Sequence, residues 1–250
     1  MTEGVGAALL YDYCCFRGYL FSEAYLSNCV GAILQSLHGG ISAQVIGGYH
    51  HPRLASIQEG RGRRKEIDFV VAEYDDGSDT KRARSKLSPM HKSQDASRIA
   101  TAVEAKWAGS SHCTLNNVVW DLVRLAMVKE DNPNATAILL LAGEKKELEK
   151  FAGKAKEVLK FEAGHFAMEL LPESQKSRKR LAAVFNEQKL QKLSFPRRLQ
   201  LACVKSTIEG QRADMFGVVA WRVETTSEKG NFVPELVTEY KSDLPTTKKT

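Results

Sequence analysis

The stretch "TAVEAKWAG", residues 101–109, carries an acidic and a basic residue inside a run whose other residues are mostly typical of a buried core. Its pattern predicts a β-strand over Arg98–Trp107. Because side chains alternate along a strand with a period of two, Glu104 and Lys106 share one face. The opposite face, which is expected to point into the core, carries Val103, Ala105 and Trp107.

The helices and strands around this strand are predicted from the spacing of apolar residues and from residues, such as proline, that end regular structure. A helix is predicted over Tyr19–Leu37 and another over Leu115–Glu130, which ends before Pro133. Strands are predicted over residues 41–48, Glu66–Tyr74 and Thr136–Gly143. Together with the strand at 98–107 they give the order α-β-β-β-α-β.

The rest of the chain alternates between helices and strands again. Helices are predicted over Glu144–Lys160 and Glu173–Leu193, and strands over His165–Leu171, Leu199–Lys205 and Met215–Glu224. We therefore predict an α/β fold with a mixed central sheet flanked by helices. Its core is expected to span residues 1–143, with a polar excursion at 75–97. A C-terminal α/β extension over 144–239 should pack on the same sheet, and a flexible tail should follow over 240–250.

The composition is that of an ordinary globular protein. The 250 residues are 43% hydrophobic and 26% charged, with a formal net charge of +6. No apolar run approaches the roughly 20 residues that span a bilayer, and the N-terminal segment lacks the features of a signal peptide. We therefore expect a cytoplasmic protein that does not bind membranes. The five cysteines show no ligand spacing, so neither a zinc site nor a disulfide framework is expected.

Two clusters of basic residues are candidates for contact with a phosphate backbone. The first, in the segment "GRGRRK", directly precedes the strand at 66–74 and consists of Arg61, Arg63, Arg64 and Lys65. The second, in the segment "KSRKR", consists of Lys176, Arg178, Lys179 and Arg180. A solvated surface is the alternative explanation for each cluster.

The E-x-K spacing occurs four times in this chain, and only Glu104–Lys106 falls on a predicted strand. The preceding strand offers Asp68, so three charged groups can converge if the two strands pair. Two close carboxylates repel each other unless a cation lies between them, and Mg²⁺ prefers such oxygen ligands together with substrate phosphate. A lysine beside them can orient or deprotonate an attacking water. This set is suited to phosphodiester hydrolysis.

At these residues the sequence resembles the PD-(D/E)xK nuclease superfamily, over roughly residues 19–143. "IDF" supplies Asp68, "VEAKW" supplies Glu104 and Lys106, and Ile67 stands where the family name has proline. The resemblance implies a restriction-endonuclease-like core and Mg²⁺ bound by Asp68, Glu104 and the carbonyl of Ala105, with Mn²⁺ as a substitute. It also implies that Lys106 acts on the water, and Glu23 is the candidate for an additional glutamate from the first helix. The expected activity is endonucleolytic cleavage of DNA in restriction, repair or defence, by a homodimer or with a partner subunit.

Several alternatives stay open at this point. The charges at 68, 104 and 106 could form a cross-strand cluster on a solvated face of the sheet. On the following helix, Asp121 and Arg124 are expected to form a surface ion pair outside the site. The chain could also be a catalytically inactive module that binds nucleic acid or supports assembly on a nuclease fold, or a ribonuclease.

Overall fold

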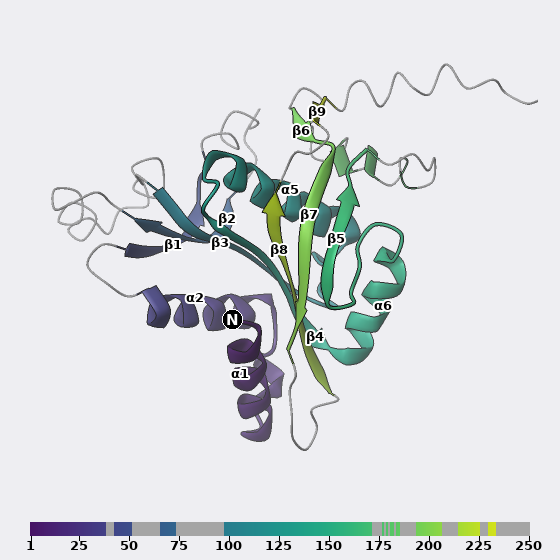
Figure 1. Ribbon diagram of the computed structural model, residues 1–250. Coiled ribbons are helices and arrows are strands. Elements are labelled where there is room, and N and C mark those ends of the chain that lie inside the picture. Colours follow the sequence, from purple (N-terminus) through teal and green to yellow (C-terminus); the bar gives the residue numbers. More distant parts are fainter. Residues whose placement is uncertain are drawn as a thin grey trace, which may run out of the picture.

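The computed structural model describes residues 1–38, 43–51, 66–73, 98–171, 194–206, 215–225 and 230–233, with six residues between 177 and 185. The chain has an α/β fold built on a mixed, mostly antiparallel sheet of seven strands (Figure 1). Four α-helices and one short 3-10 turn, η1, accompany the sheet within the fully described ranges. The predicted excursion at 75–97 and the predicted tail at 240–250 lie outside the described residues.

The strands of the large sheet run in the order β1-β2-β3-β4-β8-β7-β5. Only β3 and β4 pair in parallel, and the other neighbours pair antiparallel. Their bounds are β1 Ala43–Tyr49, β2 Ile67–Glu73, β3 Arg98–Trp107, β4 Thr136–Glu144, β5 Gly164–Glu169, β7 Arg198–Lys205 and β8 Phe216–Thr225. The short strands β6 (Phe195–Pro196) and β9 (Asn231–Phe232) form a separate pair. The sheet is therefore continuous from the predicted core into the C-terminal half of the chain.

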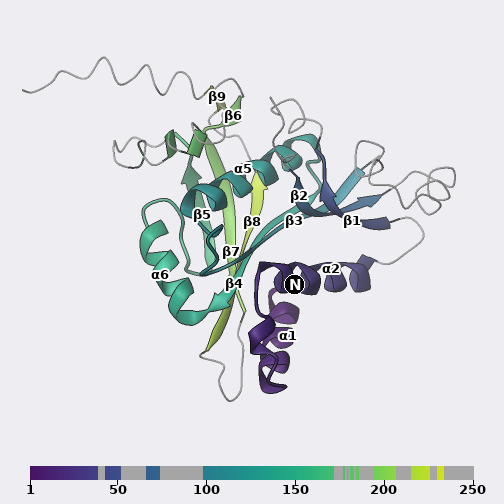
Figure 2. The same ribbon diagram turned by 180° about the vertical axis from the view of Figure 1, so that it is seen from behind.

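Helices cover both faces of this sheet. On one face lie α1 (Thr2–Cys14) and α2 (Glu23–His38), and on the other lie α5 (Leu115–Asp131) and α6 (Lys145–Ala155) (Figures 1 and 2). Two apolar clusters follow from this layering. Val103 and Ala105 of β3 belong to the cluster beneath α1 and α2, whereas Ala102 belongs to the cluster beneath α5. Successive side chains of β3 thus pack into the two apolar clusters on opposite faces of the sheet.

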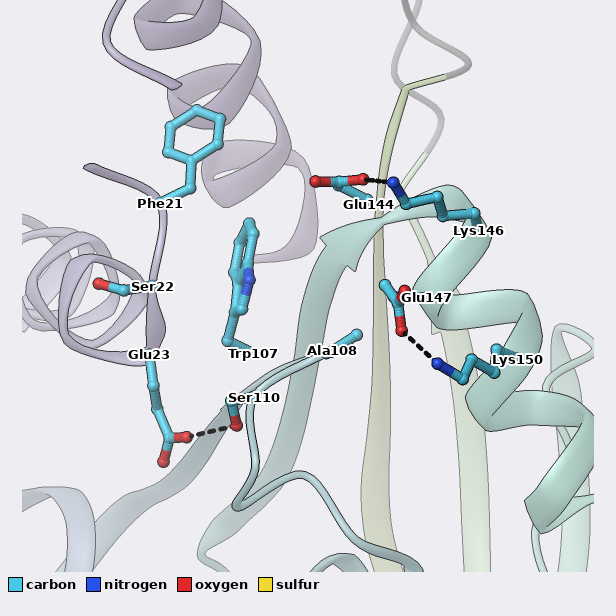
Figure 3. Close-up of a pocket in the computed structure, with 11 residues that line it drawn as sticks. Phe21, Ser22, Glu23, Trp107, Ala108, Ser110, Glu144, Lys146, Glu147 and Lys150 are labelled. Atoms are coloured by element: carbon cyan, nitrogen blue, oxygen red, sulfur yellow. Dashed lines mark hydrogen bonds and ion pairs between the residues drawn. The ribbon is translucent and has the colours of Figure 1, made fainter. Parts of the chain in front are cut away.

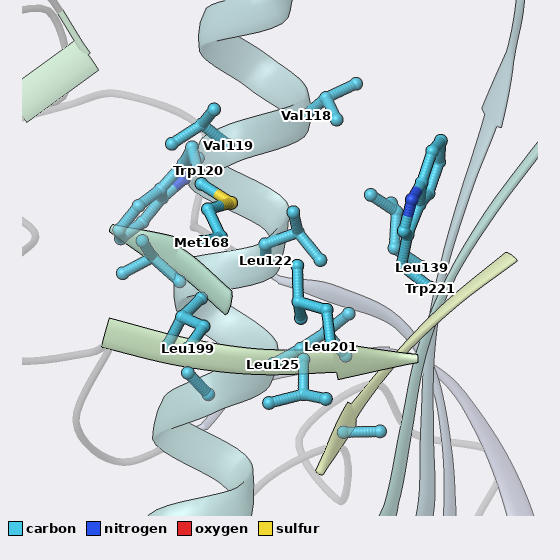
Figure 4. Close-up of a cluster of buried hydrophobic side chains, with 14 of the residues drawn as sticks. Val118, Val119, Trp120, Leu122, Leu125, Leu139, Met168, Leu199, Leu201 and Trp221 are labelled. Carbon is cyan, nitrogen blue, oxygen red and sulfur yellow. The ribbon is translucent and has the colours of Figure 1, made fainter. Parts of the chain in front are cut away.

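Helix α5 is the crossover that joins the parallel strands β3 and β4. Thr114 caps its N-terminus, since the side chain of Thr114 accepts a hydrogen bond from the Asn117 amide at 3.2 Å, and the helix ends before Pro133. All residues from Val118 to Val128 are buried, and the apolar ones among them pack against the inner face of the sheet (Figure 4). A helix buried on nearly all sides places even its polar residues inside the molecule.

The N-terminal region differs from the prediction. The helix α1 was not predicted, because its apolar residues are distributed around the helix without a polar face. The helix predicted from Tyr19 begins only at Glu23. The residues before it form the 3-10 turn η1 (Gly18–Leu20), and the hydroxyl of Ser22 accepts a hydrogen bond from the Tyr25 amide at 3.2 Å, which caps α2.

The central strands agree closely with the predicted ranges, and β3 has the predicted bounds. Strand β1 ends at Tyr49, one residue beyond its predicted end, and residues 41 and 42 of the prediction lie outside the described residues. Helix α6 ends earlier than expected, at Ala155. No helix in the described ranges is long and apolar enough to cross a membrane.

Candidate functional site

Glu104 and Lys106 lie on a strand that is covered on both faces. Strand β3 is flanked by β2 and β4 in the sheet, and α2 and α5 cover its two faces. Glu104 is 0% exposed and Lys106 is 8% exposed. A charge cluster on a solvated sheet face is therefore the wrong explanation for these two residues.

The partner of Glu104 comes from α5. The Nη2 of Arg124 lies 3.0 Å from the Oε1 of Glu104, and the same guanidinium pairs with Asp121 and donates to the backbone carbonyl of Glu66. The predicted surface ion pair between Asp121 and Arg124 is thus wrong in its location, since both residues are buried. The physical reason is that α5 lies directly over β3, so its polar stripe faces the sheet.

Lys106 joins this network to the first layer of helices. Its Nζ lies 3.3 Å from the Oδ2 of Asp121 and 3.4 Å from the Oε1 of Glu23, the first residue of α2. The other oxygen of Glu23 accepts a hydrogen bond from the hydroxyl of Ser110 at 3.1 Å. The glutamate that the sequence offered as an additional candidate therefore contacts the candidate lysine.

Asp68 reaches the same region from β2. Its Oδ2 accepts a hydrogen bond from the backbone amide of Ala105 at 2.9 Å. The antiparallel register pairs Phe69 with Val103. The hydrogen bond from Ala105 to the side chain of Asp68 therefore joins the two strands just beyond this backbone pair. This bond fixes the carboxylate next to the segment that carries Glu104 and Lys106.

The network holds more negative than positive groups. Among the residues that the structure describes, the carboxylates of Glu23, Asp68, Glu104 and Asp121 surround two cations, Lys106 and Arg124. These six groups carry a charge of −2 when all of them are ionised. Burial raises the pKa of Glu104 well above its ordinary value and also raises that of Asp121, while Arg124 opposes both shifts. The buried Oε2 of Glu104 has no hydrogen-bond partner among the described residues.

The pKa values of the two cations are raised as well, but by neighbouring charges and not by burial. Burial by itself lowers the pKa of Lys106, but the neighbouring carboxylates, led by Asp121, outweigh it and raise the pKa above its ordinary value. The same balance, led by Glu104, raises the pKa of Arg124. Both side chains are therefore cationic at neutral pH.

Most residues of the two basic clusters predicted to contact phosphate lie outside the part of the chain that the structure describes. Arg61, Arg63, Arg64 and Lys65 lie outside the described residues, as do Lys176, Arg178 and Arg180. Only Lys179 is described, and its side chain is exposed. The structure thus brings together Glu23, Asp68, Glu104 and Lys106 and leaves the role of the clusters a prediction.

Sequence reasoning missed two members of the network, Asp121 and Arg124. The signal was present in the segment "VVWDLVRLAMV", residues 118–128, where these two are the only charged residues in an otherwise apolar run. Eleven consecutive residues cover all sides of a helix, so such a run is typical of a helix that is buried all round. A charge in it requires a buried partner.

The described part of the chain contains no group of three or more His, Cys, Asp or Glu side chains placed to hold a metal ion. No known family model matches the chain, and no curated protein or solved structure is found to be similar to it.

The ion pair of Arg124 with Glu104 is expected to be essential for stability. Arg124→Met leaves the carboxylates of Glu104 and Asp121 without their nearest shared cation, and breaking a buried pair in this way typically costs about 3–5 kcal/mol. Equilibrium unfolding in urea measures the loss. Arg222→Met is the matched control, because Arg222 pairs with Glu224 on the surface at 2.7 Å and should contribute less than about 1 kcal/mol. Equal losses in the two variants would contradict the assignment.

Glu104 is also expected to make stability depend on pH. Because its pKa is raised in the folded protein, the folded state keeps a proton where the unfolded state has lost it. The contribution of Glu104 is thus present below the ordinary carboxyl pKa and is lost as the pH rises through the raised value. Glu104→Gln should flatten the fall in unfolding free energy that the wild type shows as the pH rises above the ordinary carboxyl pKa. Parallel curves for the two proteins would show that Glu104 does not titrate in this way.

Proposed function

We propose that this protein is a Mg²⁺-dependent endonuclease that hydrolyses phosphodiester bonds in DNA. The observation that carries the proposal is the convergence of Glu23, Asp68, Glu104 and Lys106 from α2, β2 and β3 around one point of the sheet. These are an acid from a first helix, an acid on one strand and an E-x-K pair on the next. A surface arrangement of charges would not need such burial, which is costly unless the groups serve one another or a ligand.

The network fits a divalent cation in charge and in donor type. When all six groups are ionised, as ligation of a metal by Glu104 would require, the surplus of two negative charges equals the charge that Mg²⁺ would bring. Carboxylate oxygens are the preferred protein ligands of Mg²⁺. Among the described residues, the buried Oε2 of Glu104 has no hydrogen-bond partner, so this oxygen is a candidate ligand atom. Asp68 and Glu104, with the carbonyl of Ala105, are the residues that would hold the ion. When bound, Mg²⁺ supplies Lewis-acid polarisation of the phosphate and a lowered pKa for a coordinated water.

The protein's own groups divide the remaining work. Lys106 is held cationic between Glu23 and Asp121, so it is suited to orient a water and to offset negative charge that develops on the phosphate. The hydroxyl of Ser110 holds Glu23 in contact with this lysine. Arg124 holds Glu104 against the sheet and balances part of the surplus negative charge.

The topology gives further support. The resemblance to PD-(D/E)xK nucleases requires the order helix, three strands, helix, strand, and α2, β1, β2, β3, α5 and β4 occur in this order. A role in restriction, repair or defence, and action as a homodimer or with a partner subunit, follow from that resemblance.

Cleavage of supercoiled plasmid tests the proposal. With Mg²⁺ the wild type should nick or linearise the plasmid, and Lys106→Ala and Glu104→Ala should each lower the rate by a factor on the order of 10²–10³. Lys205→Ala, which alters an exposed lysine on β7, should cut like the wild type. If both site variants cut as fast as this control, the site assignment is wrong. RNA digested in parallel decides between DNA and RNA as the substrate.

Binding of the metal is expected to be visible without any substrate. Mg²⁺ or Mn²⁺ at about ten times its dissociation constant should stabilise the wild type by about 1.4 kcal/mol, which raises Tm by about 2–6 °C in a chain of this size. Asp68→Asn and Glu104→Gln should remove most of this shift in a thermal melt. A shift that persists in both variants would place the ion elsewhere.

One observation favours the alternative of a catalytically inactive module that binds nucleic acid. Glu104 is fully buried and paired with Arg124, so ligation of a metal by Glu104 would replace part of an existing ion pair. In that case the protein would bind DNA in a salt-sensitive manner without cleaving it under any metal condition. The plasmid assay and a binding assay in EDTA together separate the two functions.

A further inference from the structure

A pocket of about 500 Å³ adjoins the candidate site at the ends of β3 and β4 (Figure 3). This volume lies in the range of pockets that hold small organic groups. Its walls come from the segment that leads into α2, from the loop that follows β3 and from the start of α6, as Phe21, Ser110 and Glu147 show. Because β3 and β4 are parallel, their carboxyl ends meet here, which is where open α/β sheets bind ligands.

One wall of the pocket is aromatic. Trp107, the last residue of β3, lines the pocket, and in Figure 3 its ring lies between Phe21 and the start of α6. The ring centroids of Phe21 and Trp107 are 5.8 Å apart, and Phe21 also packs edge-on against Phe216 at 5.2 Å. Phe21 is thereby fixed from behind, and Trp107 is partly exposed. The ring of Trp107, which packs on Phe21 and is partly exposed, is therefore suited to stack against another flat ring.

The charges around the pocket select against phosphate inside it. Three acids and two bases line it, and the bases are engaged by acids: Lys146 lies 2.8 Å from Glu144, and Lys150 lies 3.5 Å from Glu147. Glu23 is the third acid. A phosphate in the interior would meet a net negative charge, whereas the amino groups of a neutral nucleobase could donate hydrogen bonds to the carboxylates.

The pocket and the candidate site share two residues. Glu23 contacts Lys106 through one oxygen and Ser110 through the other, and both Glu23 and Ser110 line the pocket. Gly109, between Trp107 and Ser110, has a left-handed φ of 88°, which turns the chain from the strand into the pocket wall. A group in the pocket would therefore lie beside Glu23, whose carboxylate contacts Lys106.

We infer that this pocket receives a nucleobase of an unpaired nucleotide next to the phosphate to be cleaved, stacked on Trp107. The inference rests on the proposed nuclease function and extends it, because it assigns the substrate class as DNA with an unpaired nucleotide at the cleavage site, as in a single strand or in a locally unwound part of a negatively supercoiled plasmid. A base within a duplex is stacked on its neighbours and cannot enter a pocket without leaving the stack.

Tryptophan fluorescence in EDTA tests this directly. Trp120 and Trp221 are 5% and 0% exposed, so a bound base can quench only Trp107 among the three tryptophans. A single-stranded DNA of about eight nucleotides, a site size typical of single-strand binders, should quench the signal. An abasic strand of equal length and charge, and a duplex of the same sequence, should not. Equal quenching by the abasic strand, by the duplex or by free dAMP at equal concentration would overturn the inference.

Variants measure the contribution of the ring. By fluorescence anisotropy of a labelled strand, Trp107→Leu should weaken binding about 10-fold, in line with the loss of one base–aromatic contact. Trp107→Phe should retain most of the affinity. Tyr11→Leu, a change at an exposed aromatic residue of α1 outside the pocket, should leave it unchanged. Wild-type affinity in a folded Trp107→Leu protein would overturn the inference.

The two proposals fail separately. Binding in EDTA requires no catalysis, whereas the plasmid assay reads the reaction. If base-dependent quenching is observed but Lys106→Ala cuts as fast as the wild type, the nuclease site is wrong and the base pocket stands. If Lys106→Ala abolishes cleavage but quenching does not depend on bases, the pocket assignment alone is wrong.

Discussion

The arrangement of the site depends on one constraint, the complete burial of Glu104 in the middle of the sheet. A carboxylate removed from water loses several kcal/mol of hydration unless other charges compensate it. Arg124 supplies the nearest compensation, and Asp121 in turn shares both Arg124 and Lys106. Each charged group in the network thus has another charged group beside it. Removal of any one group changes the electrostatic compensation of the others.

The helix α5 both fills the core and carries two residues of the charged network. Its apolar residues fill the space between the helix and the strands of the central sheet, and its two charged residues complete the network over β3. Because α5 connects the parallel strands β3 and β4, its position is set by the sheet itself. The core that stabilises the fold is therefore also the scaffold that holds Arg124 against Glu104. A rigid support of this kind is what a site needs when its groups must keep a fixed geometry.

The candidate site adjoins a pocket at the ends of β3 and β4, which Glu23 and Ser110 help to line. Glu23 begins α2 and Ser110 follows β3, and their hydrogen bond joins the charged network to the aromatic pocket beside it. Buried charges on one side and an accessible tryptophan on the other give two different environments within a short distance. The charged environment is suited to a phosphate with a metal ion, and the aromatic environment to a flat, neutral ring.

The sequence by itself determined the central elements. The alternation around Glu104 predicted β3 with its observed bounds, and the apolar run before Pro133 predicted α5. It also identified Asp68, Glu104, Lys106 and Glu23 as candidates, because these residues occur in a recognisable order along the chain. Such patterns are local, and local periodicity is what a sequence displays directly.

Only the tertiary structure decided which faces are buried and which charges meet. Asp121 and Arg124 have the spacing of an ordinary surface ion pair, and their burial follows from the packing of α5 on β3. The helix α1 lacks a polar face, so its existence could not be read from periodicity. The pocket at Trp107 joins three segments that are distant in the sequence. Contacts between distant segments depend on how the layers pack, and no single stretch of the chain encodes that packing.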